Sequence, residues 1–445
     1  MTSRVDVATR ALLEELRAPA IAAVDAGDVP GVVTLVWQSG RIHDVGVVGV
    51  ADVATRRPME RSAIFPIASM SKPITVAAAL RLFDKGRLRL EDPITKWAPE
   101  FAKMRVLRNT EGPLDDTYRA PRAITIEDLM THRSGLTYGP TSRGPLGAAL
   151  TERFGFAVDS VLDPGTWLQE LAKFPLACAP GERFEYGHSI DVLGLIVGRV
   201  AGKSFQDALR EELLEPLGMT DTGFWVPPAR RDRLVAATIS AAPEQFTPST
   251  ALGYSSPTPL CFASGGQGMV STVDDYLAFA RMLIRGGESD NGRLLKAETV
   301  RLMTTNRLTP HQRRLPFMGM PFFAHQGFGL GVSMIMEAAG GVPQDSGDAG
   351  AFGWPGAFGG WWQADPANDL ILLWLQACVP PPPQAGMPPR MPGAIARADF
   401  QRAAYAFARG QAEATFEPNA SAETNPESRA DETHSHERTA RQRTI

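Results

Sequence analysis

The sequence predicts an α+β fold in which one sheet is built from both ends of the chain and an all-α lobe is inserted between the two halves. Three observations support this prediction. Strand patterns occur near the N-terminus, helical patterns dominate the middle, and strand patterns return late in the chain. Two lobes connected in this way leave a cleft between them, which is a preferred place for a ligand site.

The N-terminal part is expected to form a helix followed by a hairpin. The segment Met1 to Ala26 mixes charged and apolar residues, which indicates an amphipathic helix rather than the uncharged core of a secretory signal. Two valine-rich runs follow, Gly31 to Gln38 and His43 to Ala51, with a Ser39-Gly40 turn between them. This pattern predicts two antiparallel strands.

The middle of the chain, from about Ser71 to about Leu217, carries mainly helical signals. Two helix starts show a hydroxyl residue followed three positions later by an aspartate, and these pairs are Thr125 with Asp128 and Ser204 with Asp207. Glycines suited to ending helices are Gly135 and Gly218. We therefore expect a helical lobe over this stretch.

Strand patterns return over three later segments, which are Gly327 to Met336, Gly359 to Asp365 and Asp369 to Val379. The last is a continuous apolar run, as in a central strand that is buried on both faces, and the prolines from Pro380 to Pro383 end it. A helix predicted from Ile395 to Arg409 would pack back onto the sheet.

The domain organisation follows from these patterns. We expect one two-lobed domain over residues 1–410, with a sheet lobe from about 1–90 and 250–410 and a helical lobe from about 91–249. Residues 411–445 are rich in Glu, Thr, Ser, Asn and Arg and poor in large apolar residues, which predicts a disordered tail. His434 and His436 in that tail are better explained as solvated side chains than as metal ligands.

Composition excludes several function classes. A net charge of −4 with no basic block excludes a nucleic-acid partner. The longest uncharged stretch, Gln245 to Val273, is interrupted by prolines and glycines, so no membrane-spanning helix is expected. The cysteines, Cys178, Cys261 and Cys378, have neither disulfide-framework nor zinc-site spacing. We expect a cytoplasmic protein that acts on a small molecule without a metal or cofactor, in an oligomeric state that the sequence leaves open.

The first candidate for chemistry is the pattern Ser69-Met70-Ser71-Lys72, an S-x-x-K arrangement followed by Pro73. If Ser69 stands at a helix N-terminus, a side chain three residues later lies on the same face, so Lys72 reaches the hydroxyl. Pro73 favours this placement because a proline is harmless only in the first helical turn. Taken alone, the motif is short, and a simple helix cap is the alternative interpretation.

The second candidate is Tyr186, in a turn that leads into an apolar helix. A phenol acts as a base near neutral pH only when a cation such as Lys72 lies close enough to favour the phenolate. The alternative interpretation is an ordinary half-buried tyrosine. Nearby, Gly187-His188-Ser189 resembles a G-x-S-x-G nucleophile elbow, but Asp191 replaces the last glycine, so we interpret Ser189 as structural.

The third candidate is the glycine-rich stretch Phe352 to Trp362. Glycines there permit close approach of the backbone to a ligand, and the N–H of Ala357 is suited to act with that of Ser69 as an oxyanion hole. Trp354 would form a wall of the pocket. The alternative is a tight hairpin with aromatic packing.

The three segments, in this order, resemble the serine β-lactamase superfamily, most closely class C β-lactamases and family VIII carboxylesterases. Further segments similar to the family are Leu129 to Leu136, Glu215 to Met219 and Gly265 to Asp275, and the resemblance extends from about Ala11 to Ala408. It implies a β-lactamase/transpeptidase-like fold, with an antiparallel sheet flanked by helices and a helical lobe.

The resemblance also implies residue roles. Ser69 would be the nucleophile, Lys72 its proton acceptor and Tyr186 the base that later activates water. Substrate-binding positions would be His188, Trp354 and Gly356. Two of these depart from β-lactamases, because Trp354 stands where a lysine binds the substrate carboxylate and His188 stands where an asparagine is usual.

Because a neutral aromatic side chain cannot replace the charge of that lysine, a neutral ester is the expected substrate. The leading hypothesis is a carboxylesterase that cleaves short-chain esters through an acyl-Ser69 intermediate. The alternatives are a β-lactamase or DD-peptidase-like amide hydrolase and an acyltransferase that uses the same acyl-enzyme. A non-catalytic scaffold is the least favoured reading, because the serine, lysine and tyrosine are all present.

Overall fold

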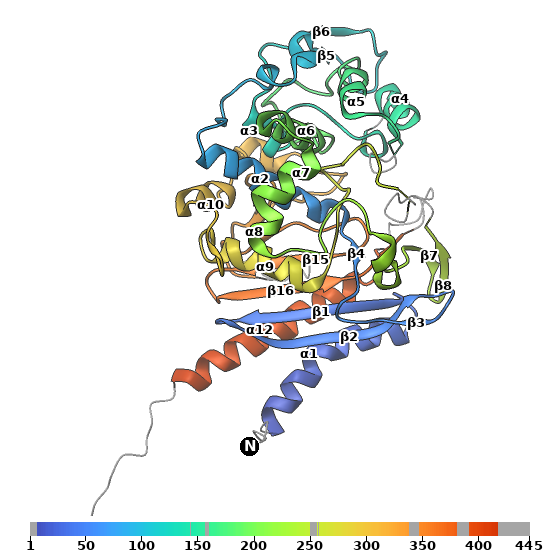
Figure 1. The fold of residues 1–445 in the computed structure, drawn as a ribbon, viewed down its shortest axis with the longest axis vertical. Helices are drawn as coiled ribbons and strands as arrows, with labels where there is room; N and C mark the ends of the chain where they lie inside the picture. Colours follow the sequence, from blue (N-terminus) through green and yellow to red (C-terminus); the bar gives the residue numbers. More distant parts are fainter. Residues whose placement is uncertain are drawn as a thin grey trace, which may run out of the picture.

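An eight-stranded antiparallel sheet forms one end of the molecule (Figure 1). The computed structural model describes residues 7–142, 144–155, 160–249, 256, 258–337, 347–380 and 391–416. In sheet order the strands are β12 (Gln326–Phe328), β13 (Ser333–Ile335), β14 (Phe352–Gly353), β15 (Trp361–Asp365), β16 (Leu370–Leu375), β1 (Gly31–Gln38), β2 (Arg41–Asp52) and β3 (Arg57–Pro58). Since β16 pairs with β1, the two ends of the chain meet inside one sheet, as predicted.

Helices α1 (Val7–Asp25) and α12 (Ala394–Phe416) cover the outer face of this sheet (Figure 1). Alternating residues of the central strands separate its two faces, because side chains of a strand point to opposite sides. Val36 of β1 and Trp374 of β16 belong to the core beneath α1 and α12, whereas Leu35 and Leu373 belong to the main core on the other face. Every residue of β16 is buried, which confirms the prediction of a central strand.

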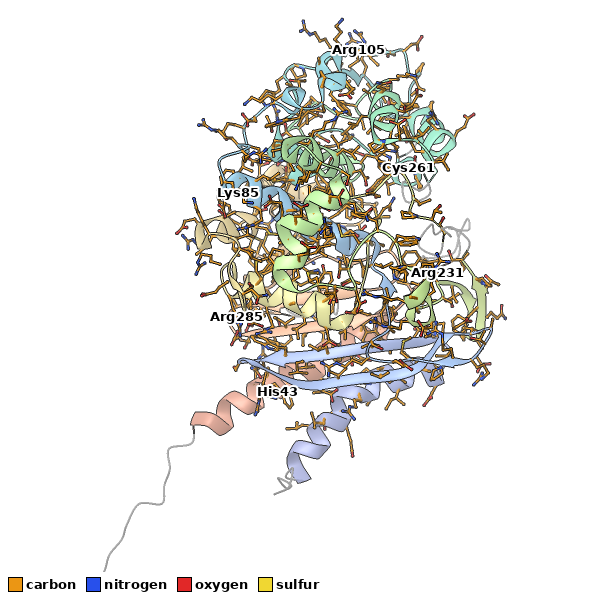
Figure 2. All side chains as sticks on the ribbon, in the orientation of Figure 1. His43, Lys85, Arg105, Arg231, Cys261 and Arg285 are labelled. Atoms are coloured by element: carbon orange, nitrogen blue, oxygen red, sulfur yellow. The ribbon has the colours of Figure 1, made fainter. Side chains whose placement is uncertain are left out.

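The remaining helices lie on the inner face and beyond it (Figure 1). They are α2 (Ser71–Asp84), α3 (Ile126–Met130), α4 (Gly144–Phe154), α5 (Pro164–Leu171), α6 (Ser189–Ala201), α7 (Phe205–Leu209), α8 (Glu215–Leu217), α9 (Val273–Ile284), α10 (Ala297–Met303) and α11 (Pro310–Arg314). The predicted caps are present, since Thr125 and Asp128 form a capping box and the Ser204 hydroxyl accepts from the Asp207 N–H. Figure 2 places Arg105 at the far tip of this helical part and His43 at the sheet end.

Small strand pairs complete the fold. They are β4 (Phe65–Pro66) with β9 (Val270–Ser271), β5 (Arg105–Leu107) with β6 (Thr117–Arg119), β10 (Glu288–Ser289) with β11 (Gly292–Arg293), and a three-stranded sheet of β7 (Thr238–Ala242), β8 (Gln245–Pro248) and β17 (Cys378–Val379). The β5–β6 hairpin, within the stretch predicted to be helical, was not anticipated, because strands of three residues carry too little alternation to detect.

Two strand predictions were wrong in detail. The segment predicted as one strand from Gly327 to Met336 forms two strands, β12 and β13, because Gly331 has a positive φ of 76° and the chain turns there. The segment from Asp369 to Val379 also divides, since β16 ends at Leu375 and β17 leaves the main sheet to pair in parallel with β7. In both cases a continuous apolar pattern concealed a change of direction.

Helix α12 continues to Phe416, past the point where the tail was predicted to begin. The residues Gln411 to Ala414 are good helix formers and extend a helix that is already nucleated. The predicted disordered tail beyond Phe416, with His434 and His436, lies outside the described residues. Among the helices of the described ranges, every one is too short or too polar to cross a lipid bilayer.

Candidate active site

Ser69 lies at the junction between the sheet lobe and helix α2. Strand β4 leads to it, and the Ile67 N–H donates to the Met269 carbonyl (3.0 Å), which ties this segment to β9. Ala68 has a positive φ of 44°, an uncommon conformation for a residue with a side chain. The chain then turns through a single 3₁₀ turn into α2, with Pro73 in the first helical turn as predicted.

Lys72 is fully buried directly beside Ser69. Its Nζ donates to Ser69 Oγ (3.0 Å) and to the carbonyl of Gly266 (2.7 Å). The one-turn spacing therefore produces the contact that the S-x-x-K motif predicts. Because a buried amine needs partners for its N–H groups, the Gly266 carbonyl holds Lys72 in a fixed direction.

Tyr186 approaches Ser69 from the helical lobe. Its Oη lies 2.7 Å from Ser69 Oγ, and Lys72 Nζ lies 4.5 Å from the centre of its ring. The loop that carries Tyr186 is held because Glu185 N–H donates to the His132 carbonyl (2.7 Å). Gly187 packs so tightly that a Cβ there would lie 2.3 Å from the Leu136 carbonyl oxygen, so only glycine fits.

The glycine-rich stretch reaches the same place from the sheet. The Trp354 indole Nε1 donates to Tyr186 Oη (3.2 Å). Gly356 lies against the backbone that precedes Ser69, where an added Cβ would be 2.4 Å from the Ile67 carbonyl oxygen. Ala357 is exposed, and its N–H has no hydrogen-bond partner within the described part of the chain. Its participation in an oxyanion hole stays a prediction.

The remaining predicted residues lie deeper in the helical lobe. His188 is 1% exposed, and its Nδ1 pairs with Asp191 (3.2 Å). Among the described residues, it has no contact with Ser69 or Lys72, so a role in binding substrate stays a prediction. Ser189 is buried and its hydroxyl pairs with that of Ser134 (2.8 Å), away from Ser69.

Comparison with known proteins assigns this arrangement to a family. The family model described as Beta-lactamase matches residues 10–391. The chain belongs to the beta-lactamase family. The match includes all three of the segments that meet at Ser69, and the predicted β-lactamase/transpeptidase-like fold is thereby confirmed.

Three relatives of this beta-lactamase-family chain are informative. Protein Rv1367c of Mycobacterium tuberculosis H37Rv is 47% identical over 353 residues, which cover 79% of this chain and 86% of the relative. Esterase EstB of Burkholderia gladioli is 30% identical over 372 residues, covering 78% and 85%. The solved structure of EstCE1, a hydrolase with promiscuous acyltransferase activity, has a TM-score of 0.72 and 26% identity, covering 90% of this chain and 100% of that one.

A buried carboxylate behind the site was not identified as functional from the sequence. Asp191 is fully buried and accepts from four donors, which are Ser264 Oγ (2.5 Å), the Gly266 N–H (3.0 Å), Tyr138 Oη (3.2 Å) and His188 Nδ1 (3.2 Å). Burial alone would raise the pKa of Asp191, but these hydrogen bonds and the Lys72 cation hold its pKa below the usual value. Through Gly266, which contacts both residues, Asp191 positions the carbonyl that holds Lys72.

We expect Asp191→Asn to weaken both stability and catalysis in this beta-lactamase-family chain. Asparagine keeps one acceptor oxygen but replaces the other with an NH2 group, so two of the four buried donors lose their acceptor, which should lower the free energy of unfolding by about 3 kcal/mol. Misplacement of Lys72 should lower kcat by up to about 100-fold. Urea unfolding and ester kinetics measure the two effects.

Asp274→Asn is the matched control, since that aspartate pairs with Arg61 at the surface and is about half exposed. Its loss should change the unfolding free energy by less than about 1 kcal/mol and leave kcat unaltered. Equal effects of the two substitutions on the unfolding free energy and on kcat would show that the Asp191 contacts contribute no more than a surface ion pair does.

A second buried group, His132, is predicted to make stability pH-dependent. His132 is fully buried next to the Tyr186 ring (4.6 Å between ring centres). Burial, together with the nearby Lys72 cation, holds the pKa of His132 well below its usual value. The unfolded chain therefore takes up a proton at His132 more readily than the folded one. The stability that depends on a neutral His132 is complete above about pH 6.5 and is lost as the pH falls below that value.

Between pH 7.5 and pH 5.5 the protonation of this site in the unfolded chain should lower the unfolding free energy of the wild type by on the order of 1 kcal/mol. His132→Asn removes the titration and suits the positive φ of 52° at this position. Urea unfolding at the two pH values should show a smaller pH dependence in the variant, and an identical pH dependence would contradict the assignment.

Proposed function

We propose that this protein is a carboxylesterase that cleaves esters of small carboxylic acids through an acyl-Ser69 intermediate. One observation carries the proposal. The Ser69 hydroxyl lies within hydrogen-bond distance of both the Lys72 amine and the Tyr186 phenol, at 3.0 and 2.7 Å, although Tyr186 is 117 positions further along the sequence than Ser69. A hydroxyl between an amine and a phenol is arranged to lose its proton while it attacks a carbonyl.

Acylation uses the contact between Ser69 and Lys72. Ser69 Oγ bonds to the ester carbonyl carbon while its proton passes to the Lys72 amine. The negative charge on the carbonyl oxygen is stabilised by the backbone N–H groups of Ser69 and Ala357. When the carbon–oxygen bond of the ester breaks, the alcohol leaves with the proton from Lys72, and the acyl group stays on Ser69.

Deacylation uses Tyr186. Acting as the base, Tyr186 accepts a proton from the water that attacks the acyl carbon, and this proton passes to Ser69 Oγ when the acyl bond breaks. Two neighbours fix the position of Tyr186, namely Lys72 Nζ, 4.5 Å from the centre of its ring, and the Trp354 N–H, which donates to Tyr186 Oη. The carboxylic acid product is then released.

An ester is favoured over a β-lactam or a peptide by the neutral Trp354. Its N–H binds Tyr186 rather than offering a positive charge to a substrate carboxylate. Among the described residues, Lys72 is the sole cationic side chain in contact with Ser69 or Tyr186, and its N–H groups already serve the site. Amide hydrolysis of the β-lactamase or DD-peptidase type is therefore the weaker alternative.

Acyl transfer to an alcohol is a second candidate function, because the same acyl-Ser69 would be attacked by an alcohol in place of water. EstCE1, whose structure aligns with 90% of this chain, is described as a hydrolase with promiscuous acyltransferase activity. Adding a primary alcohol during ester cleavage, and measuring the transesterified product, compares the two reactions directly.

Purified protein is expected to hydrolyse p-nitrophenyl acetate and butyrate faster, in kcat/KM, than the β-lactam nitrocefin. The neutral Trp354 provides the reason, since it offers no charge to the β-lactam carboxylate. Release of p-nitrophenol and the colour change of nitrocefin measure the two rates. A faster reaction with nitrocefin would refute the argument from Trp354.

We also propose a cytoplasmic location, a small-molecule ester as the substrate, and one catalytic domain over residues 1–410. Cys178 and Cys378 are buried, and Cys261 lies at the surface (Figure 2). Burial raises the pKa of Cys178 to about 12, so that thiol is unreactive. The odd number and wide spacing of the three cysteines, which predict no disulfide framework, suit a reducing compartment.

A further inference from the structure

An apolar turn beside Tyr186 extends the site. From Leu315 to Ala324 the sequence contains no polar side chain, and we name this segment the apolar turn. Phe317 and Met320 exchange two backbone hydrogen bonds (2.9 and 3.0 Å), and Met318 and Gly319 between them both have positive φ values of 52° and 78°. This is the geometry of a tight two-residue hairpin.

The tip of the apolar turn is exposed while its base is fixed. Met318 is 66% exposed and Met320 is 52% exposed. At the base, the Arg313 guanidinium donates to the carbonyls of Phe323, Ala324 and Gln326. Met318 and Met320, on either side of Gly319, expose apolar side chains to solvent on a turn whose base is fixed. Exposed apolar surface of this kind often marks a binding site.

The apolar turn reaches the catalytic tyrosine through aromatic rings. The Phe317 ring lies 5.5 Å from the Tyr186 ring and 6.4 Å from that of Trp354, and Phe322 lies 5.9 Å from Trp354. This hydrophobic cluster is completed by Leu308, Phe184, Phe323 and Phe328. Met318 directly follows Phe317 in the chain, so the exposed tip of the turn begins one residue from the wall of the site.

The position of Tyr186 indicates which part of an ester faces this wall. Water must attack the acyl carbon from the side that the alcohol has vacated, so the base that activates it stands where the alcohol leaves. Groups packed against Tyr186 therefore border the alcohol, not the acyl group. With no charged or hydrogen-bonding side chain on the turn, the complementary alcohol is large and apolar.

We propose that the apolar turn and Phe317 form the binding site for the alcohol portion of the substrate, and that the natural substrates are short-chain acyl esters of a bulky apolar alcohol. This inference rests on the proposed esterase function and specifies its substrate class. The same surface would hold the acceptor alcohol in acyl transfer.

Two isomeric esters test the proposal. Hexyl acetate carries its chain on the alcohol side and ethyl hexanoate carries it on the acyl side, so their overall hydrophobicity is matched, with ethyl acetate as the short reference. Each fully buried methylene is worth about fourfold in kcat/KM. For the wild type we expect hexyl acetate to exceed ethyl acetate by at least about tenfold, and ethyl hexanoate to show no comparable gain.

The double variant Met318→Ser/Met320→Ser should lower kcat/KM for hexyl acetate by about fivefold, mainly through KM, and leave ethyl acetate unchanged. Both methionines are exposed, so the variant should fold. Val161→Ser and Ile395→Ser are matched controls, because these side chains are 84% and 80% exposed outside the apolar turn. Neither control should alter the ratio of kcat/KM for hexyl acetate to kcat/KM for ethyl acetate.

Several results would overturn the inference. These are a preference for ethyl hexanoate that the double variant removes, equal loss with all three esters, or a wild-type dimer that becomes monomeric in the variant, which would assign the turn to a second copy of the chain. Failure of the wild type to hydrolyse any of these esters would instead refute the proposed function itself.

Discussion

Ser69→Ala should lose nearly all esterase activity, with kcat falling by at least about a thousandfold. The hydroxyl is the atom that both Lys72 and Tyr186 contact, so its removal leaves these two groups without a nucleophile to serve. Kinetics with p-nitrophenyl butyrate measure the loss. Mass spectrometry of the protein during turnover should detect an acyl adduct in the wild type and none in the variant.

Ser189→Ala is the matched control for this prediction. It removes another buried serine hydroxyl in the same region, but one that pairs with Ser134 rather than with Lys72. Activity should stay within about threefold of the wild type, because a neutral hydrogen bond contributes only about 1 kcal/mol to stability. An equal loss of activity in Ser69→Ala and Ser189→Ala would contradict the assignment of Ser69 as the nucleophile.

Tyr186→Phe should lower kcat by about 100- to 10,000-fold, the range for loss of a general base. The substitution deletes one oxygen and keeps the ring that packs on His132 and Phe317. Because deacylation depends on this oxygen, the acyl-enzyme should accumulate in the variant. Intact mass measured over time after one dose of ester would detect that accumulation.

Tyr138→Phe provides the comparison. Tyr138 also lies near Lys72, with 5.5 Å from Nζ to the ring centre, but its hydroxyl donates to Asp191 rather than to Ser69. We expect a loss of less than about tenfold with no trapped acyl-enzyme, since the group helps to position the site without touching the reacting atoms. A trapped intermediate in Tyr138→Phe but not in Tyr186→Phe would reverse the two roles.

The sheet could be predicted well where the local pattern was long. The valine-rich hairpin and the apolar run of β16 each extend over six or more residues, so periodicity and burial agree. The pattern failed where strands were short. The β5–β6 hairpin and the division of the Gly327 to Met336 segment depend on turns that local sequence signals only weakly.

Within the site, the contact between Ser69 and Lys72 was the part that sequence could predict, because the two residues are one helical turn apart. Asp191 was visible only as a misfit in an apparent nucleophile elbow. Its importance arises from donors on distant segments, Ser264 and Gly266 among them, which no local spacing connects to it.

The sequence by itself determined the S-x-x-K pair, the central strands and the family resemblance, since each is encoded in neighbouring residues whose spacing sets their geometry. Only the tertiary structure brought Tyr186 and Trp354 to Ser69, buried Asp191 behind Lys72 and placed the apolar turn at the site. The physical reason is that these contacts join segments far apart in the chain, and their distances depend on how the two lobes pack together.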